Sequence, residues 1–552
     1  MVKNWPSGVP EKLSFRQGEK PLFEYLRSHA RRFPDKTALI YYGREISYRE
    51  LDQLTDRFAN FLVKNNVKKG DRVALFLPNC PQYIICHHGA QKAGAVVGPC
   101  SPMFREWELE YELNDMGAET LVTMDQLYPV AEKIRSKTGL KRVIVTGYGE
   151  FLPDHPTLPL PDEMKLPGKH FPDTLEFSRI MSEYPAQPVS IDIDMREDVA
   201  LMVYTSGTTG LPKGAMLTYY NALFKTAAAV EVSRNTENEV TLSVMPLFHI
   251  AGMLMGVNSF LYFGGTQVLL SRFDPLAVAE AIEKYRVSYW YSAAPMNVGI
   301  MQLPGINERD FGSLRLNLCT SFGIALTEEI GLAWQKIAPN CHIYEAAYGL
   351  SETHTLDTFM PWDRVKYGST GIPIYETVIK IVDPGDSQKE MPAGSEGEIL
   401  LKTPGLFKGY WNRPEATAEA MRDGWLHTGD IGRLDEDGYL YLLGRKKEMI
   451  KCSGYSVFPE EVEAFLIRHE AVAQAAVIGV PDPVRGESVK AFIVLKQGYE
   501  GKVGSDDIIS WSRERMSPYK YPREVAFRSS LPATGAGKVL RRVLAEEEKS
   551  RS

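Results

Sequence analysis

The chain has 552 residues, more than one hydrophobic core usually supports, so we expect at least two domains. With 44% hydrophobic and 24% charged residues, its composition is typical of a globular protein. The formal net charge is −7, without the basic excess on which nucleic-acid binders depend. We therefore expect no nucleic-acid partner, and we expect any bound phosphate to be held at a local site.

Helix and strand patterns alternate through about the first 440 residues. Within residues 47–65, Leu51, Leu54, Phe58 and Phe61 share one helical face, and Ser47 is the predicted N-cap. The elements expected first are helices at 21–33, 47–65 and 81–94 and strands at 37–42, 71–78 and 95–100. This alternation with short connections predicts an α/β fold with parallel sheets wrapped by helices. Residues 138–192 are rich in Pro and polar residues and are interpreted as a surface excursion.

The N-terminal residues MVKNWPSGVPEK have no apolar core and do not resemble a signal peptide. Residues 240–271 contain no Asp, Glu, Lys or Arg, but Pro246, His249, Asn258 and the pair Gly264-Gly265 interrupt them. A buried helix followed by a strand is favoured there over a membrane span. We predict no transmembrane segment, and we leave peripheral membrane contact and a homodimer open.

The six cysteines are scattered, and none is paired at CxxC spacing: Cys80, Cys86, Cys100, Cys319, Cys341 and Cys452. A metal site formed by Cys80, Cys86, His87, His88 and Cys100 is weighed against buried thiols and ordinary histidines. Thiols are favoured, because the histidines interrupt a predicted helix. This cysteine usage is typical of a reducing cytosol and predicts a cytoplasmic protein.

A change of pattern comes near residue 444. LDEDGYLYLLG (434–444) predicts a hairpin; its DxDG fragment also occurs in calcium loops, but Arg433 and Gly444 replace the first and last ligands. An α+β pattern follows, with helices at 459–469 and 505–516 and strands at 473–480, 489–496 and 524–528. We predict a large domain over 1–444, a small mobile domain over 445–552, and a hinge at 445–447.

The segment YTSGTTGLPKGAML (204–217) is rich in Gly, Ser and Thr and contains Lys213. Neither GxxxxGK[ST] nor GxGxxG fits its spacing. Its composition nevertheless suits phosphate, since glycines let backbone N–H groups converge and hydroxyls and a lysine add donors. A surface loop without a ligand is the alternative.

Further motifs follow in order and resemble those of the adenylate-forming acyl-CoA synthetases, most of all the long-chain fatty acid–CoA ligases. The segment at 204–217 resembles the phosphate-loop motif of that family, and the likeness extends over nearly the whole chain from about Pro21. The other matching segments are AYGLSET (347–353), DGWLHTGD (423–430), GRKKEMIKCSGYSVFPEEVE (444–463) and LPATGAGKVLRR (531–542). The resemblance implies a large adenylate-forming domain that includes a small β-barrel-like part.

The resemblance implies sites for ATP and Mg²⁺. The β- and γ-phosphates would be held by Lys213 with Thr205, Ser206, Gly207, Thr208, Thr209 and Gly210. Ser351, where the family more often has Thr, would donate to the α-phosphate, and Glu352 with Thr205 would bind Mg²⁺. The nucleoside would be held by Gly323, Ile324, Ala325, Tyr348, Gly349, Asp430 and Arg445, with Asp430 accepting from the ribose hydroxyls. For Glu352, a surface carboxylate is the alternative.

The resemblance also implies two chemical steps. Lys538 would bridge the substrate carboxylate and the α-phosphate during adenylation, and His249 would orient the acid; a solvated lysine and a core histidine are the alternatives. After rotation about the hinge, Lys451, Ser453 and Gly454 would line the channel for the thiol of CoA. A charged surface hairpin is the alternative for that segment.

Several residues depart from the family pattern. Phe322 replaces a glycine, Ala325 a proline, and Ala347 stands where glycine is frequent, which puts the shape of the acyl pocket in doubt. Gly444 replaces an Asp before Arg445. The apolar segments 250–265 and 289–301 lack a cation for a second carboxylate and favour a long- or medium-chain fatty acid. The rivals are an aryl or short-chain acid, a carrier-protein thiol as acceptor, a luciferase-like oxygenase and a non-catalytic acyl-AMP sensor.

Overall fold

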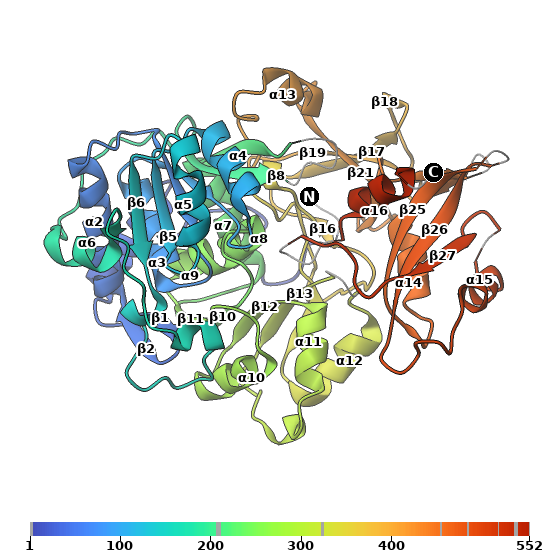
Figure 1. Ribbon diagram of the computed structural model, residues 1–552, viewed down its shortest axis with the longest axis horizontal. Helices are drawn as coiled ribbons and strands as arrows, with labels where there is room; N and C mark the ends of the chain where they lie inside the picture. The colour runs from blue at the N-terminus through green and yellow to red at the C-terminus, as the bar shows by residue number, and fades with distance from the viewer. Residues whose placement is uncertain are drawn as a thin grey trace.

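The computed structural model describes residues 4–205, 211–321, 325–452, 455–482, 485–516, 518–534 and 539–550. In Figure 1 the chain runs from two sheets at the left and lower centre to a smaller sheet with three helices at the right. The predicted α/β architecture is confirmed.

Two seven-stranded sheets dominate the described chain, and each is parallel except at one edge. The first sheet has β2 as its antiparallel edge strand. Its order is β14 (His342–Glu345), β13 (Leu316–Thr320), β12 (Tyr289–Ala293), β10 (Val240–Ser243), β11 (Thr266–Leu269), β1 (Thr37–Tyr41) and β2 (Arg44–Ser47).

The second sheet has β9 as its antiparallel edge strand. Its order is β7 (Leu175–Glu176), β6 (Arg142–Thr146), β5 (Thr120–Met124), β3 (Arg72–Phe76), β4 (Val96–Pro99), β8 (Val199–Thr205) and β9 (Lys213–Thr218). Strand β6 lies within the stretch that the sequence analysis interprets as a surface excursion. That interpretation is wrong for residues 142–146, which are mostly buried.

Helices fill the space between the two parallel sheets. Helix α3 (Pro81–Lys92) is buried at every position and contacts β3 and β4 of the second sheet. It packs on α2 (Tyr48–Lys64), which contacts the first sheet, and Ser47 caps α2 by accepting from the Glu50 N–H as predicted. Helix α7 (Tyr219–Val232) contacts β8 and β9 and packs on α9 (Ser259–Phe263). Helices buried on all sides belong inside a molecule, so the core lies between the sheets.

The remaining helices of this part lie around the sheets. They are α1 (Leu22–Arg32), α4 (Glu106–Met116), α5 (Tyr128–Ile134), α6 (Phe177–Glu183), α10 (Pro275–Lys284), α11 (Ala294–Met301) and α12 (Glu328–Ile337). The charge-free residues 240–271 form β10, then α8 (Ile250–Met253), a π-helical turn at Leu254–Asn258, α9 and β11. The predicted buried helix and strand are confirmed, with a further strand in front of them. Among the described residues, no helix is both long enough and apolar enough to span a membrane.

An antiparallel sheet follows, preceded by the short pair β15 (Thr358–Phe359) and β16 (Ile372–Pro373). Its described strands are β18 (Asp386–Glu390), β17 (Val378–Asp383), β19 (Gly397–Lys402), β21 (Trp425–Leu434), β20 (Met421–Arg422) and β22 (Leu440–Arg445), with α13 (Pro414–Ala420) before β20. Strands β21 and β22 form the predicted hairpin around the 435–439 turn.

The C-terminal part has its own sheet and core. Its described strands are β24 (Tyr455–Val457), β23 (Ile450–Cys452), β26 (Gly486–Leu495), β25 (Val472–Asp482) and β27 (Glu524–Phe527). Its helices are α14 (Pro459–Leu466), α15 (Ser505–Arg513) and α16 (Arg541–Lys549). A separate apolar cluster built on Val477, Ile493 and Ile508 fills this part. The predicted α+β pattern is confirmed.

The chain crosses from one part to the other within three residues. Lys446 still bonds to the antiparallel sheet, donating its backbone N–H to Gly429 O at 2.8 Å and its ammonium to Glu398 at 2.8 Å. Glu448 instead pairs with Arg541, whose side chain is 10% exposed and also pairs with Glu460 and Glu463 at 2.6 Å each. The side-chain partners of the chain therefore change between Lys446 and Glu448, while Glu448 N still donates to Arg445 O at 3.0 Å.

All six cysteines are buried free thiols. Burial raises the pKa of Cys80 to about 12 and lowers the pKa of His88 to about 4, so both stay neutral at pH 7. His87 and His88 belong to α3 and are buried there. The favoured interpretation of these residues, buried thiols and ordinary histidines, is consistent with this environment.

Candidate active site

The glycine-rich segment closes a hairpin between β8 and β9. These strands pair antiparallel, and Thr205 and Lys213 are partners at the open end. Ser206, Gly207, Thr208, Thr209 and Gly210 lie outside the described residues. The two ends of the segment are therefore held at one point, and a strand rather than a helix follows it.

Residues 408–411 cover the edge strand β9. Trp411 N donates to Gly214 O at 2.8 Å, and Met216 N donates to Gly409 O at 3.0 Å. This pairing places Tyr410 beside Lys213, whose ammonium lies 4.5 Å from the centre of the tyrosine ring. The contact is a cation–π interaction, which restrains the lysine close to the open end of the glycine-rich segment.

Glu352 lies in a helical turn at Ser351–Thr353. Its Oε1 accepts a 2.6 Å hydrogen bond from the Tyr410 hydroxyl, and its carbonyl oxygen accepts from Phe407 N at 2.8 Å. Burial and the nearby Glu352 charge raise the pKa of Tyr410, which therefore remains a donor at pH 7. Lys213, Tyr410 and Glu352 thus form one chain of contacts between two predicted motifs. The sequence analysis did not identify Tyr410. The local signal is the segment GYWNRP (409–414), in which a glycine and then a helix-starting proline are typical of a turn before a helix.

Tyr348 begins a second chain of contacts. Its side chain is buried, and its hydroxyl donates to Asp430 Oδ2 at 2.5 Å. A side chain at Gly349 would collide with the backbone, since an added Cβ would lie 2.3 Å from Leu356 N. Glycine is therefore required between the predicted adenine contact Tyr348 and the turn that carries Glu352.

Asp430 and Arg445 are direct partners across the β21–β22 hairpin. Arg445 Nε lies 2.7 Å from Asp430 Oδ1, and a second guanidinium nitrogen donates to Thr428 O at 3.0 Å. Burial opposes the charge of Arg445, but Asp430, Tyr348 and Glu352 outweigh it and raise the pKa of the guanidinium. The charge of Arg445 thus interacts with members of both chains of contacts. The two chains meet on residues 348–352, because Tyr348 belongs to one and Glu352 to the other.

His249 is the N-cap of α8 and is half-buried. Its Nδ1 accepts from Ala251 N at 3.4 Å, and its backbone N–H bonds to Pro246 O. The imidazole is therefore held at the start of a helix and is partly exposed.

The other predicted residues are described only in part. Lys451 is exposed on β23, and its backbone N–H donates to Glu487 at 2.7 Å. Ala325 is exposed. Lys538 lies outside the described residues, but its loop is closed at its base by a bridge between Ala533 and Val539. Ser453, Gly454, Gly323 and Ile324 also lie outside the described residues, as does Phe322.

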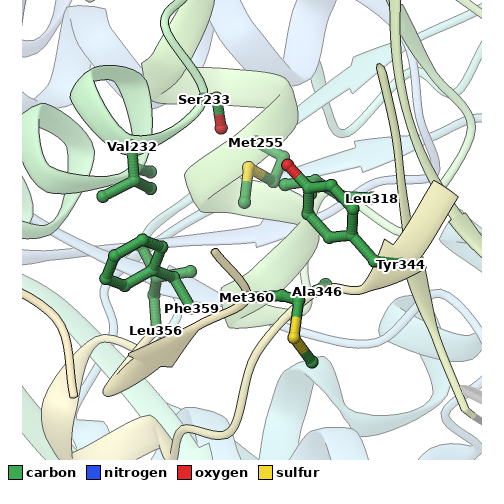
Figure 2. Close-up of a pocket in the computed structure, with 10 residues that line it drawn as sticks. Val232, Ser233, Met255, Leu318, Tyr344, Ala346, Leu356, Phe359 and Met360 are labelled. Atoms are coloured by element: carbon green, nitrogen blue, oxygen red, sulfur yellow. The ribbon is translucent and has the colours of Figure 1, made fainter. Parts of the chain in front are cut away.

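A narrow apolar cavity adjoins the same turn (Figure 2). Leu356 comes from the segment just after Glu352, and Leu318 and Tyr344 come from β13 and β14. Met255 is the contribution of the charge-free segment predicted to bind an acyl chain. The cavity is completed by Ala229, Val232, Ser233, Ala346, Phe359 and Met360, none of which the sequence analysis identified. Segment 289–301, the other predicted contributor, does not line it.

The surroundings of Glu352 fit a magnesium ion bound together with phosphates. In the described part of the chain, the carboxylate accepts one hydrogen bond, through Oε1, which leaves Oε2 to face a cation. No group of three or more His, Cys, Asp or Glu among the described residues could hold a metal ion by itself. Mg²⁺ prefers oxygen ligands and is commonly bound by one or two carboxylates plus substrate phosphates.

Comparison with known proteins gives the family. A family model for the AMP-binding enzyme matches residues 26–411, and one for the AMP-binding enzyme C-terminal domain matches residues 461–538. The long-chain-fatty-acid–CoA ligase of Bacillus subtilis (strain 168) is 37% identical over 559 residues, covering 99% of this chain and 98% of the relative. The feruloyl-CoA synthase of an Amycolatopsis species is 34% identical, covering 93% and 96%.

Solved structures agree with this relationship. The anthranilate CoA ligase AuaEII, solved with anthranoyl-AMP, superposes with a TM-score of 0.83 at 27% identity, covering 99% of both chains. ATP-bound MatB from Rhodopseudomonas palustris superposes with a TM-score of 0.81 at 28% identity, covering 95% of this chain and 99% of its own. Family models, relatives and structures align along almost the whole length, so the chain belongs to the AMP-binding enzyme family and is an adenylate-forming acid–CoA ligase.

Proposed function

We propose that the protein activates a long- or medium-chain fatty acid. The acid would react with ATP to give acyl-AMP and pyrophosphate, and the thiol of CoA would then attack the acyl-AMP to give acyl-CoA and AMP. Activation is needed because a carboxylate has no adequate leaving group for a thiol at neutral pH. The observation that carries the proposal is the meeting of the Lys213–Tyr410–Glu352 and Tyr348–Asp430–Arg445 contacts on residues 348–352.

The nucleotide would be bound along these two chains of contacts. Lys213 and the segment from Thr205 to Gly210 would hold the β- and γ-phosphates, while Ser351 would donate to the α-phosphate. Tyr348 would pack against adenine. Asp430 would give up part of its bonding to Tyr348 and Arg445 and would accept hydrogen bonds from the ribose hydroxyls instead, with Arg445 remaining beside it. Such fixed donors and charges stabilise a phosphoryl group without reorganising during the reaction.

Magnesium would be held by Glu352, with Thr205 at the end of β8. When bound, the ion neutralises phosphate charge and orients the pyrophosphate as a leaving group. The Tyr410 hydroxyl would keep the Glu352 carboxylate oriented, since it donates to Oε1 and leaves Oε2 directed elsewhere.

The fatty acid would enter beside Leu356, where the apolar cavity of about 10 Å³ would have to widen by movement of its lining side chains to receive an alkyl chain. The cavity is lined by Met, Leu, Phe and small residues and has no cation in its lining, as an alkyl chain requires. His249, at the start of α8, would orient the carboxylate. The curated relatives named above include a fatty-acid enzyme and an aryl-acid enzyme, and the higher identity lies with the fatty-acid one.

The two steps would use two positions of the C-terminal part. We propose a hinge at 445–447, supported by the change of partners between Lys446 and Glu448. Lys538 would contact the α-phosphate during adenylation, and Lys451, Ser453 and Gly454 would line the thiol channel after rotation. We assign the reaction to the cytosol, since all six thiols are free. Homodimer formation and peripheral membrane contact stay predictions.

Pyrophosphate exchange with a panel of acids tests the proposal. Exchange should depend on alkanoic acids of medium to long chain and on Mg²⁺, and AMP release should then require CoA. Exchange with aryl or short-chain acids only would transfer the assignment to the rival substrates. Release with a carrier-protein thiol but not with CoA would change the acceptor, and light or oxygen consumption would indicate a luciferase-like reaction.

A further inference from the structure

A buried ion pair lies directly behind the turn that carries Ser351 and Glu352. Lys225 of α7 and Asp357 are both fully inaccessible to solvent. The Lys225 ammonium lies 2.7 Å from Asp357 Oδ1 and donates to Leu356 O at 2.8 Å. Neither residue belongs to a motif identified from the sequence, and neither is assigned a role above.

Asp357 is bonded to both ends of the proposed nucleotide motif. Its Oδ2 accepts from the Thr353 hydroxyl, one residue after Glu352. Its backbone N–H donates to Tyr348 O at 2.7 Å. A displacement of Asp357 would therefore move both the residue proposed to contact adenine and the turn proposed to contact phosphate.

The backbone between Thr353 and Asp357 is strained. His354, Thr355 and Leu356 have φ of 57°, 59° and 54°, a left-handed conformation that non-glycine residues rarely adopt three times in succession. Such strain persists only where surrounding contacts fix it, and it gathers at functional sites. The Lys225 ammonium, bonded to Leu356 O, is the buried charge that fixes the end of this stretch.

Helix α7 connects the same turn to the phosphate segment. It starts directly after β9, the strand that begins at Lys213. One turn before Lys225, Asn221 donates to Pro404 O at 3.0 Å, and the Lys225 side chain packs against Gly405. Phe407, two residues further on, donates its N–H to Glu352 O. Helix α7 is thus linked to the Glu352 turn in two ways: directly, from Lys225 to Leu356 O, and through the 404–407 segment, whose Phe407 bonds to Glu352 O.

A contribution to stability does not by itself explain why the Lys225–Asp357 pair is charged. Two charges removed from water cost much of what their attraction returns, so apolar residues of similar volume often serve the fold equally well. What a charged, hydrogen-bonded pair adds is a fixed geometry for the groups bonded to it.

We propose that the Lys225–Asp357 pair positions the Tyr348–Glu352 segment for Mg-ATP, an inference that rests on the proposed function. Lys225 and Asp357 are positioning residues: they touch the segment from behind and do not contact substrate. Their removal should weaken ATP binding and slow adenylation while leaving the fold in place.

The test replaces both charges together, as K225M/D357L, because either single change would leave one buried charge unpaired. The comparison variant is K92M/D56L: Lys92 and Asp56 lie 2.8 Å apart on α3 and α2, in a buried charge cluster that also includes Asp52 and Arg27, so it reports what the loss of other buried charges does to ATP binding. Thermal unfolding, calorimetric ATP binding with and without Mg²⁺, and pyrophosphate exchange are measured on all three proteins.

We expect the Lys225–Asp357 variant to unfold within about 5 °C of the unmodified protein. Its ATP Kd should rise at least about tenfold, and its exchange rate should fall at least about tenfold. The control should keep the ATP Kd of the unmodified protein. A Kd within about twofold of the unmodified protein for the Lys225–Asp357 variant, or an equal loss in the control, overturns the inference.

If the double variant does not fold, Thr353→Val provides the second measurement, since it removes the hydroxyl donated to Asp357, together with the bonds of that hydroxyl to Leu350 N and O. It should raise the ATP Kd about threefold or more, and an unchanged Kd overturns the inference. The proposed function is judged separately: an unmodified protein that binds ATP but exchanges pyrophosphate with no acid contradicts that function, while the ATP affinities still decide this inference.

Discussion

Tyr410 donates a 2.6 Å hydrogen bond to the carboxylate of Glu352, across 58 residues of sequence. The face of the same ring lies 4.5 Å from the Lys213 ammonium. One side chain therefore orients the proposed metal ligand and restrains the proposed phosphate-binding lysine. The spacing of the cation and the carboxylate at this site depends on a residue that need not touch the substrate at all.

Replacing Tyr410 with Phe tests this relationship. The ring and its contact with Lys213 remain, while a hydrogen bond to a charged group worth about 1.5–3 kcal/mol is lost. Pyrophosphate exchange should fall about 10- to 100-fold, and the Mg²⁺ concentration needed for half-maximal rate should rise. Tyr441→Phe is the control, since it removes a 3.4 Å bond to Asp435 in the hairpin turn. Unchanged magnesium dependence in Tyr410→Phe would contradict the orienting role.

Asp430→Asn tests the ribose assignment. The substitution removes the negative charge that pairs with Arg445 at 2.7 Å and replaces one of the two acceptor oxygens with an NH2 group, so the side chain can no longer accept from Tyr348 and from both ribose hydroxyls. Calorimetry should show the Kd of ATP rising about 10- to 100-fold. Asp383→Asn, which breaks a surface pair with Lys389, should leave binding unchanged. Equal affinities for the two variants would remove Asp430 from the nucleotide site.

Lys538→Ala and Lys451→Ala should separate the two half-reactions. Loss of Lys538 should abolish adenylation but spare thiol transfer from supplied acyl-AMP, because its charge is needed only at the α-phosphate. Loss of Lys451 should damage thiol transfer more than adenylation. Each variant is assayed by pyrophosphate exchange and by CoA-dependent AMP release. An equal loss of both steps in Lys538→Ala, or a loss of adenylation alone in Lys451→Ala, argues against two catalytic faces.

The buried His354 predicts a pH dependence of stability. Burial lowers its pKa from 6.5 to about 4, and neither ring nitrogen has a hydrogen-bond partner among the described residues. Between pH 6.5 and 4 the unfolded chain binds the extra proton, so the free energy of unfolding decreases as pH falls, by up to about 1.4 kcal/mol per pH unit.

His354→Asn should flatten that dependence, as asparagine tolerates the left-handed backbone at this position. Denaturant unfolding at several pH values measures the slope. His155 is exposed, so His155→Asn should keep the slope of the unmodified protein. The assignment fails if both variants have the same slope.

Ala346→Phe tests the acyl cavity. Ala346 is 5% exposed and lines the cavity together with Leu356 and Tyr344, so a phenyl ring there would prevent the cavity from widening for a long alkyl chain. The KM for long-chain acids should rise at least about tenfold, while that for short acids changes little. Exchange assays with acids of increasing length provide their own control. A uniform change across all lengths would indicate that the chain binds elsewhere.

Much of the fold could be predicted because its signals are local. The apolar face of residues 48–64, its cap Ser47 and the hairpin around residues 435–439 depend on near neighbours in sequence. Strand β6 is not predictable in the same way, because its five residues adjoin a long proline-rich stretch that dominates the composition. Helix α14 ends at Leu466, three residues before the predicted end, since helix ends depend on tertiary contacts.

The candidate site was only partly predictable. Motif residues such as Tyr348, Glu352 and Asp430 are recognisable, because the family pattern marks them. Their supporting contacts are not, because Tyr410 and Lys225 lie 58 and 132 residues from Glu352 and Asp357, respectively. The left-handed stretch at 354–356 contains no glycine, so the local sequence does not predict it.

The hairpin that encloses the glycine-rich segment has a consequence for protein engineering. Its strands are paired in unbroken register from Leu201–Leu217 to Thr205–Lys213, and β9 is held on its other edge by residues 408–411. Inserting or deleting residues between 206 and 210 would therefore alter the loop without shifting the register of either strand. The length of the loop is thus adjustable without disturbing the strands that hold it, which makes it the natural place to alter how tightly the triphosphate is bound.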